Sequence, residues 1–213
     1  MLRSVRSRVK STVLNALPNT RVIRRGPTNL RRVALTFDDG PDEMTGHYLD
    51  LLDRLACPAT FFLPGRRVEL RPAMVREYTR RGHQVAAHGY DHRRFPDLGW
   101  GELRDQLDRT DALIGVQPAG RPWVRPPFGA IDARSLAQMM ALGYVVAMWS
   151  LDSGDWEVRD PDEIAGRSVA ATSGDVVLLH EGQDWTLAAV PRIVRGLRDA
   201  GYELVTMADL FPR

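Results

Sequence analysis

The stretch Asp175-Val-Val-Leu-Leu-His180 is apolar between its two end residues and ends in a histidine. A half-exposed strand alternates apolar with polar residues, whereas an uninterrupted apolar run indicates a strand that is covered on both faces. Such strands are typical of parallel sheets, because the helices that connect parallel strands pack on the two faces of the sheet. This segment therefore favours an α/β fold built around a parallel sheet.

Similar apolar runs alternate with amphipathic segments from Arg32 onward, which is the pattern of repeated strand-helix units. The runs predict seven strands, at residues 33–37, 60–63, 84–87, 123–124, 144–149, 175–179 and 203–205. The amphipathic segments predict six helices, at residues 44–55, 72–81, 101–115, 132–142, 162–171 and 187–200. Three of these helices are expected to end at the glycines Gly82, Gly143 and Gly201.

Composition narrows the class of protein. The chain has 213 residues, 44% of them hydrophobic and 26% charged, which is typical of one globular domain and excludes a disordered or coiled-coil chain. Its single cysteine, Cys57, excludes an internal disulfide framework and a multi-cysteine zinc site. Arg, Asp, Gly or Pro interrupts every apolar run before it reaches the roughly 20 residues that span a bilayer.

Residues 1–31 are basic and contain no acidic residue, and we predict them to be an N-terminal extension of a folded domain at residues 32–213. The apolar stretch at residues 13–17 is shorter than the roughly 7 to 15 residues of a signal-peptide core, so we expect no secretory signal and a cytoplasmic protein. A helix at residues 2–17 would place apolar side chains opposite Arg and Lys. This pattern fits peripheral membrane contact through residues 1–17, and a solvated tail fits it as well. Nucleic acid is not an expected partner, since acidic residues outnumber basic ones in the rest of the chain.

Five polar clusters follow predicted strands. Their sequences are Thr36-Phe-Asp38-Asp39-Gly-Pro41, His88-x-x-x-His92, Arg125-Pro-Pro-Phe128-Gly129, Asp152-x-x-Asp155-Trp156 and His180-Glu181. Parallel α/β folds place their functional sites in the loops at the carboxyl ends of the strands. We therefore expect all five clusters on the same side of the sheet.

The spacing of the histidines indicates a metal site. His88 and His92 are four residues apart, so on a helical turn both imidazoles face the same way. With Asp38 or Asp39 they would make a three-ligand site with an open position for water, which is typical of catalytic zinc. The other aspartate could act as a general base, and His180 could protonate a leaving group. A tight turn at the aspartates and structural histidines are the alternatives.

The five clusters, with Leu178-Leu-His180 as the last, resemble in order the five motifs of the polysaccharide deacetylases, the NodB-homology domain of carbohydrate esterase family 4. The resemblance covers residues 32–211. It implies a distorted (β/α) barrel of about seven parallel strands and a catalytic domain at residues 32–213. It also implies removal of N-acetyl groups from amino sugars with one divalent metal ion. Zn²⁺ is the expected ion, and Co²⁺, Ni²⁺ or Mn²⁺ would also suit two histidines and an aspartate.

The resemblance also implies roles for the catalytic residues. Asp38 would be the general base, held in its ionised form by Arg125, and would deprotonate the water that attacks the acetamide carbonyl. His180 would protonate the departing amine, and Asp152 would orient the imidazole of His180. These four residues would carry the proton transfers of the reaction.

The remaining motif residues would hold the metal and the substrate. The resemblance assigns the metal to Asp39, His88 and His92. It implies that the backbone N–H of Phe128 stabilises the oxyanion, that Leu178 packs on the acetyl methyl group, and that Trp156 forms a wall of the groove. Core packing is the alternative for Trp156 and Leu178.

Some residues depart from the family pattern or lie outside it. Gly89 stands where Ser or Thr usually braces the metal-binding loop, and His47 and His83 match no ligand position, so we expect them to be structural or surface residues. Arg66 and Arg67, in a predicted loop, could bind an anionic group such as phosphate or be solvated.

The sequence thus predicts a metal-dependent hydrolase that removes N-acetyl groups from an amino-sugar-containing glycan or glycoconjugate. Three alternatives stay open. The first two are an O-acetyl esterase and a deacylase of a lipid-linked or nucleotide-linked sugar, since the same active-site residues serve these reactions. The third, from a different class, is an inactive glycan-binding module on the same barrel.

Overall fold

The computed structural model describes residues 21–115 and 121–211, so the predicted helix at residues 2–17 and its membrane contact lie outside the described residues. The described residues form nine strands, β1 Val22–Ile23, β2 Arg32–Asp38, β3 Thr60–Leu63, β4 Gln84–Ala87, β5 Trp123–Val124, β6 Val145–Ala147, β7 Leu151–Asp152, β8 Val176–His180 and β9 Glu203–Val205. All nine form one sheet, in which eight follow the order β1-β6-β5-β4-β3-β2-β8-β7 and β9 pairs with β2. Every pairing between these strands is parallel.

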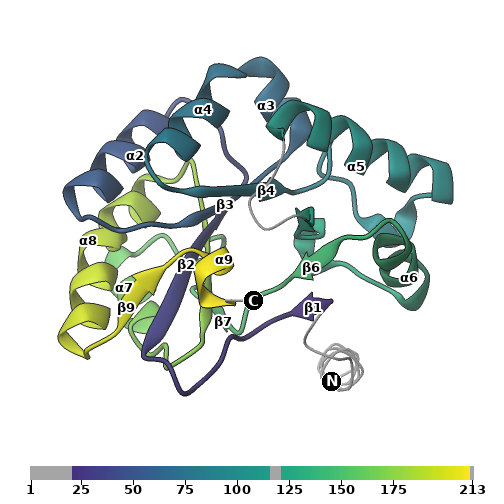
Figure 1. The fold of residues 1–213 in the computed structure, drawn as a ribbon. Helices are drawn as coiled ribbons and strands as arrows, with labels where there is room; N and C mark the ends of the chain where they lie inside the picture. Colours follow the sequence, from purple (N-terminus) through teal and green to yellow (C-terminus); the bar gives the residue numbers. More distant parts are fainter. Residues whose placement is uncertain (1–20, 116–120, 212–213) are drawn as a thin grey trace.

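The helices lie mainly around the outside of this sheet (Figure 1). They are α2 Thr45–Arg54, α3 Gly65–Leu70, α4 Ala73–Arg80, α5 Trp100–Ile114, α6 Ala133–Ala141, α7 Pro161–Ser168, α8 Asp184–Asp199 and α9 Met207–Leu210, with short 3-10 turns η1 Phe95–Asp97 and η2 Pro127–Gly129. The sheet curls into an open half-barrel. The predicted α/β fold, a distorted barrel of parallel strands, is confirmed.

The strand count and one boundary differ from the prediction. Strands β1 and β7, of two residues each, were not predicted, and they bring the seven predicted strands to nine. Val22 and Ile23 of β1 fall within the predicted N-terminal extension, yet they are buried and pair with Val146 and Ala147 of β6. The folded domain therefore begins before residue 32.

Helix ends follow the expected chemistry. Gly82, Gly143 and Gly201 come just after α4, α6 and α8 and have positive φ angles of 81°, 89° and 80°, which glycine adopts at little cost. Asp132 caps α6 by accepting a hydrogen bond from the backbone N–H of Ser135 at 2.8 Å. Two helices were not predicted, α3 and α9, and both are shorter than two full turns.

Successive side chains along each strand point alternately to the outer face of the sheet, against the helices, and to the inner face of the curl. In β2, Leu35 and Phe37 belong to the cluster that packs against the outer helices, whereas Ala34 belongs to a separate cluster inside the curl. Successive residues of a strand point to opposite faces. Thr36 and Asp38 therefore fall on the inner face, at the carboxyl end of the strand.

The same alternation applies to the neighbouring strand β8. Leu179 belongs to the outer cluster and Val176 to the inner one. Leu178 and His180 therefore share the inner face with Asp38, and His180 is the register partner of Asp38 across the two strands. The inner face is apolar at the start of the strands and carries polar side chains at their carboxyl ends.

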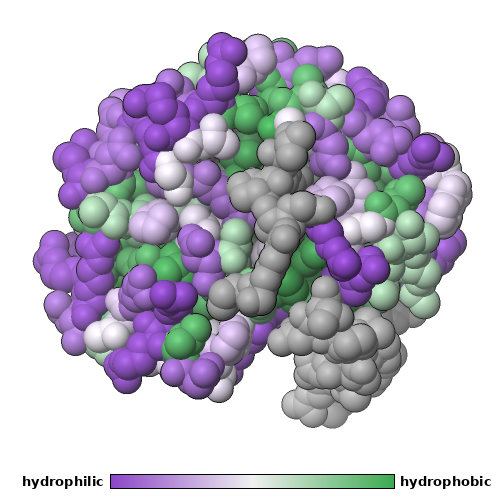
Figure 2. Space-filling view, viewed as in Figure 1, coloured by the Kyte–Doolittle hydropathy of each residue, from purple (hydrophilic) through white to green (hydrophobic). Residues whose placement is uncertain are grey.

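The outer surface is mostly polar in the view of Figure 2, where hydrophilic residues cover much of the helical periphery and hydrophobic ones lie scattered between them. None of the helices in the described ranges has the length and apolar composition needed to cross a bilayer.

Candidate active site

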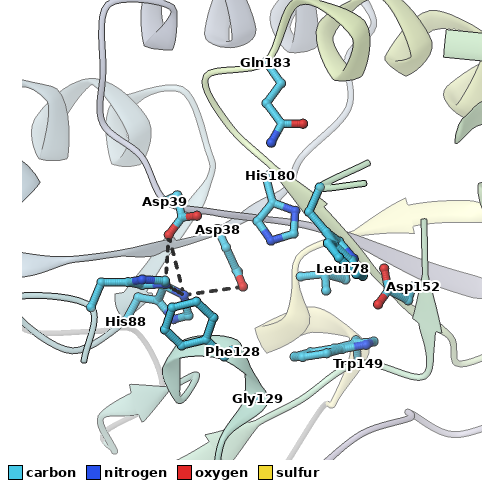
Figure 3. Close-up of a pocket in the computed structure, with 12 residues that line it drawn as sticks. Asp38, Asp39, His88, Phe128, Gly129, Trp149, Asp152, Leu178, His180 and Gln183 are labelled. Carbon is cyan, nitrogen blue, oxygen red and sulfur yellow. Dashed lines mark hydrogen bonds and ion pairs between the residues drawn. The ribbon is translucent and has the colours of Figure 1, made fainter. Parts of the chain in front are cut away.

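The carboxyl ends of the strands surround a cavity of about 400 Å³, which Figure 3 shows in close-up. Nine of the ten residues predicted for the site line it, namely Asp38, Asp39, His88, His92, Phe128, Asp152, Trp156, Leu178 and His180. The tenth, Arg125, is fully buried and does not line the cavity, but it contacts Asp38, which does. Trp149 and Gln183 also line the cavity and were not predicted.

Asp39, His88 and His92 form a group that fits a metal ion. The Nε2 atom of His92 lies 3.2 Å from both Asp39 Oδ1 and His88 Nε2, and His88 Nε2 lies 3.8 Å from Asp39 Oδ1. A single ion at about 2.0 to 2.2 Å from each donor, the range for zinc with nitrogen and oxygen ligands, fits these separations. No second such group of His, Cys, Asp or Glu side chains occurs among the described residues.

The backbone brings these donors together by two unusual conformations. Asp39 and His92 have positive φ angles of 74° and 61°, in the left-handed region that non-glycine residues rarely occupy. Such conformations tend to be retained at functional sites. Burial raises the pKa of Asp39, but the charges of His88, His92 and His180 lower it more, so the pKa lies below its ordinary value. A carboxylate that is ionised in this way is suited to bind a cation.

The ring of His88 is oriented by the main chain of another motif. Its Nδ1 atom lies 2.7 Å from the carbonyl oxygen of Arg125, and the ring is 2% exposed. Because a carbonyl only accepts hydrogen bonds, Nδ1 carries the proton and Nε2 keeps a free electron pair. The free electron pair faces Asp39 and His92, as metal binding requires.

The guanidinium of Arg125 fixes the second aspartate of the first motif. Its Nη1 atom donates to Asp38 Oδ1 at 2.7 Å and to the Thr36 hydroxyl at 2.8 Å. Other donors of the same guanidinium reach the carbonyl oxygens of Ala147 and Met148 at 3.3 and 3.2 Å. The guanidinium thus engages one oxygen of the buried Asp38 carboxylate, and the other oxygen, Oδ2, lies 3.7 Å from His88 Nε2. Thr36 was not predicted, although its position two residues before Asp38 places it on the same face of β2.

A third aspartate, Asp155, holds His180. Its Oδ1 lies 2.7 Å from His180 Nδ1, and its Oδ2 accepts hydrogen bonds from the His180 backbone N–H and the Thr186 hydroxyl at 2.7 and 2.8 Å. Burial lowers the pKa of His180, but the hydrogen bond and charge of Asp155, with smaller contributions from Asp38 and Asp39, raise it to about 9. The imidazole is therefore protonated at neutral pH.

The prediction that Asp152 orients His180 is corrected by this geometry. Asp152 ends β7 as the register partner of Leu178, and its Oδ1 accepts a hydrogen bond from the Gly154 backbone N–H at 2.9 Å. Figure 3 shows Asp152 beside Leu178 rather than at the imidazole. The turn after β7 directs Asp155, which is fully buried, back to His180.

Two aromatic side chains stand exposed at the rim of the cavity. Phe128 is 67% exposed and Trp156 is 59% exposed, whereas Leu178 is buried in the cavity wall. The Phe128 ring also packs on His92, with 4.5 Å between ring centroids. Large apolar faces in contact with water are typical of binding surfaces, and rings of this kind can stack on the apolar face of a sugar. The core-packing alternative for Trp156 is therefore wrong.

The sequence itself matches a known family over most of the described domain. The family model for "Polysaccharide deacetylase" matches residues 25–147, more than half of the chain. The chain belongs to the polysaccharide deacetylase family. This match confirms the family resemblance that the sequence motifs indicated.

Individual family members are similar over longer stretches. The chain is 32% identical to the peptidoglycan-N-acetylglucosamine deacetylase PgdA of Listeria monocytogenes, over 99% of this chain and 45% of that protein. The chain thus spans about half the length of this relative. The crystal structure of the Bc1960 peptidoglycan N-acetylglucosamine deacetylase is similar with a TM-score of 0.84 and 30% identity, covering 89% of this chain and 92% of that one.

The family also contains a protein described as inactive. BA3943 of Bacillus anthracis, a carbohydrate esterase family 4 pseudoenzyme, is similar with a TM-score of 0.82 and 27% identity, covering 92% of this chain and 70% of that one. Membership in the polysaccharide deacetylase family therefore establishes the fold but does not by itself establish turnover.

The departure of this chain from the family pattern at Gly89 has a structural explanation. Gly89 has a φ of 71°, and a Cβ atom there would lie 3.2 Å from the Phe95 ring. Its carbonyl oxygen accepts a hydrogen bond from the Gly65 backbone N–H at 2.9 Å. The Thr110 hydroxyl lies 3.0 Å from the same oxygen and 2.8 Å from the Gln106 carbonyl oxygen, so its single proton is shared between the two. The loop is therefore braced at position 89 through a backbone carbonyl rather than through a side chain.

A buried carboxyl next to His180 links two motif loops. Glu181 is 4% exposed and accepts hydrogen bonds from the hydroxyls of Tyr78, at 2.8 and 2.9 Å, and Thr45. Its backbone N–H donates to the Asp38 carbonyl oxygen at 2.9 Å. Gly40 has no room for a Cβ atom, because the Glu181 carboxylate fills that space. Glu181 thus joins the loop after β2 to the loop after β8.

Proposed function

We propose that this chain is a metal-dependent hydrolase that removes N-acetyl groups from N-acetylglucosamine-containing glycans. The observation that carries the proposal is the pairing of Asp38 with His180, which are register partners on neighbouring strands beside the ligand group. Neighbouring strands lie about 4.8 Å apart, so a proton acceptor and a proton donor can address one reacting group. The names of the relatives supply the substrate class.

Asp38 is the proposed general base. Arg125 engages its Oδ1, and its Oδ2 lies 3.7 Å from Nε2 of His88, toward the ligand group. A carboxylate in this place can take the proton of a water that attacks the acetamide carbonyl. The guanidinium fixes the direction of the carboxylate, so the base does not have to reorganise during the reaction.

His180 is the proposed general acid. Because Asp155 engages Nδ1, the Nε2 atom is the one that can donate a proton to the departing amine nitrogen. A pKa raised to about 9 keeps this proton on the ring at neutral pH. The amine leaves only after protonation, because an amide anion is a poor leaving group.

The remaining residues of the proposed site would hold the metal ion, the oxyanion and the sugar. Asp39, His88 and His92 would hold one divalent ion, which would supply Lewis-acid activation of the carbonyl and of the attacking water. The backbone N–H of Phe128 is proposed as a second donor to the oxyanion, and Leu178 as the contact of the acetyl methyl group. Trp156 would stack on the sugar.

An inactive glycan-binding module is the proposal from a different class, and the likeness to BA3943 supports keeping it. Against it stands the complete set of a base, an acid and three ligands in hydrogen-bond or metal-binding geometry. O-acetyl ester hydrolysis and deacylation of a lipid-linked or nucleotide-linked sugar use the same groups and are distinguished by substrate.

The decisive experiment measures acetate release from N-acetylglucosamine oligomers by protein that is stripped with chelator and reloaded with zinc. We expect release to return with the metal, and Asp38→Asn to lower the rate roughly 10²- to 10⁴-fold with unchanged zinc content. Stoichiometric zinc without release from the oligomers, from an O-acetylated sugar or from a lipid-linked or nucleotide-linked sugar would favour the binding module.

A further inference from the structure

A second, smaller cavity adjoins the candidate active site. It measures about 180 Å³ and shares two walls, Asp39 and His92, with the larger cavity. Arg66 and Arg67 line its other side. Because the shared walls are two of the three metal ligands, a sugar whose acetamide lies at the ligand group can place a neighbouring substituent in the smaller cavity.

Side chains rather than backbone groups are the available donors in this cavity. The two arginines belong to α3, so the predicted loop is a short helix. The backbone N–H groups of Gly65 and Arg66 already donate to the carbonyl oxygens of Gly89 and Tyr90, at 2.9 and 2.8 Å. Any anion in the cavity is therefore bound by guanidinium groups.

Both guanidinium groups, of Arg66 and Arg67, have N–H donors available to bind an anion. Arg66 is exposed and forms no ion pair with any carboxylate in the part of the chain that the structure describes. The side chain of Arg67 is 45% exposed, and its contact with Asp42 Oδ2 is long, at 3.7 Å. A guanidinium binds carboxylate or phosphate oxygens through paired N–H donors, and such contacts are stronger than exposed surface ion pairs.

Two carboxylates, of Asp39 and Asp91, also line the smaller cavity and contribute to its net charge. Asp39 belongs to the ligand group, where a divalent ion would offset its charge. Asp91 accepts a hydrogen bond from the backbone N–H of Arg93 at 3.3 Å, which occupies one of its oxygens. When the ion offsets Asp39, the two positive charges of Arg66 and Arg67 exceed the one negative charge of Asp91. The cavity then carries a net positive charge, which attracts an anion.

We propose that Arg66 and Arg67 form a subsite for an anionic substituent, a carboxylate or a phosphate, on the sugar that carries the acetamide or on the sugar next to it. The subsite rests on the proposed function, because it needs the acetamide at the ligand group. It would make the enzyme select anionic amino-sugar substrates over neutral ones of the same size.

The test compares three probes: a neutral N-acetylglucosamine oligomer, an oligomer containing N-acetylmuramic acid with its carboxylate, and N-acetylglucosamine 1-phosphate. Zinc-loaded wild type is compared with the double variant Arg66→Gln/Arg67→Gln. We expect the ratio of kcat/KM between the preferred anionic probe and the neutral probe to fall at least 10-fold in the variant. Whichever probe loses its advantage identifies the carboxylate or the phosphate as the bound group.

A matched control removes two exposed arginines from α8, in Arg192→Gln/Arg195→Gln, and should leave the ratio unchanged. Calorimetric titration with N-acetylmuramic acid and with N-acetylglucosamine 1-phosphate gives a readout that does not depend on turnover. Binding that weakens at least 10-fold in the Arg66/Arg67 variant, without turnover of any probe, would keep the subsite and reject the proposed function. Equal losses for all probes, or anion binding that the substitutions leave unchanged, would reject the subsite.

Discussion

The carbonyl oxygen of Arg125 lies 2.7 Å from Nδ1 of His88, while the guanidinium of Arg125 lies 2.7 Å from Oδ1 of Asp38. One residue thus orients a candidate metal ligand, His88, through its backbone and the proposed base, Asp38, through its side chain. The two contacts can be separated by mutation, because a substitution changes the side chain and leaves the carbonyl in place. They allow the metal site and the base to be tested independently.

Arg125→Lys is expected to keep zinc and to lose activity. Lysine retains the positive charge but has no planar fork to reach Asp38, Thr36 and the carbonyl oxygens together. We expect kcat to fall roughly 10- to 100-fold, the usual effect of losing an orienting contact, with zinc content unchanged by elemental analysis. Zinc loss in proportion to activity would contradict this separation of roles.

Arg125→Met tests the same pair for stability. The substitution leaves the Asp38 carboxylate buried without a partner, at a cost of about 3 to 5 kcal/mol in the free energy of unfolding. Arg125→Met/Asp38→Asn should recover part of this loss, because it removes the unpaired charge as well. Urea denaturation of wild type and of the single and double variants measures the effect. Equal stability of Arg125→Met and the double variant would show that the unpaired charge is not the cause.

Asp155→Asn is expected to move the alkaline limb of the pH-rate profile. The hydrogen bond and charge of Asp155 oppose burial and keep the pKa of His180 at about 9. The proposed general acid, His180, works only when it is protonated. Removing the charge of Asp155 lowers the pKa of His180, so the rate should fall at a lower pH. We expect the midpoint of this limb in kcat/KM to drop by at least about one unit.

Asp152→Asn is the matched control for this prediction. Asp152 carries the same charge and lies three residues away, but its carboxylate contacts the Gly154 backbone instead of His180. The alkaline limb should therefore stay at the wild-type pH, whatever the rate. A shift in Asp152→Asn that equals the shift in Asp155→Asn would return the orienting role to Asp152.

These two aspartates show where inference from sequence ends. The clusters after the strands and the alternation along β2 and β8 were sufficient to bring all ten predicted residues to one site. The choice between Asp152 and Asp155 depends on how a three-residue turn directs its side chains, and spacing in the sequence contains no such information. Strands β1 and β7 were also missed: two residues show no periodicity, although β5, of the same length, was predicted.

His83 is expected to make the protein less stable in acid. It is 6% exposed, its Nδ1 accepts a hydrogen bond from the Ala59 backbone N–H at 3.2 Å, and its Nε2 finds no partner within the described residues. Burial lowers its pKa to about 4, below the value of about 6.5 for an unfolded chain. The unfolded chain therefore binds the proton more tightly, and stability falls as the pH drops from 6.5 to 4, by on the order of 3 kcal/mol.

His83→Asn removes this titration and keeps an oxygen that can accept the Ala59 hydrogen bond. The measurement is the difference in the free energy of unfolding between wild type and variant at several pH values, which cancels contributions common to both proteins. Wild type should lose stability relative to the variant below pH 6.5. A difference that does not change with pH would show that His83 titrates alike in both states.

Glu181 is expected to have the opposite effect on stability over nearly the same range. Burial raises its pKa to about 7, although hydrogen bonds from Thr45 and Tyr78 work against this shift. Because the folded-state pKa lies above the unfolded value of about 4.3, the folded protein holds the proton more tightly. The stabilisation of the folded state by this tighter proton binding is fully present below the unfolded pKa of about 4.3. It is lost as the pH rises through the folded pKa of about 7.

Glu181→Gln should therefore gain stability relative to wild type between about pH 4.3 and 7, as measured by urea denaturation. The amide oxygen of the variant can still accept the Tyr78 hydrogen bond, so the fold is retained. Because His83 and Glu181 act in opposite directions, stability should rise more steeply with pH across this range in Glu181→Gln than in wild type, and less steeply in His83→Asn. A wild-type profile as steep as that of Glu181→Gln would show that the carboxyl of Glu181 does not titrate in the folded protein over this range.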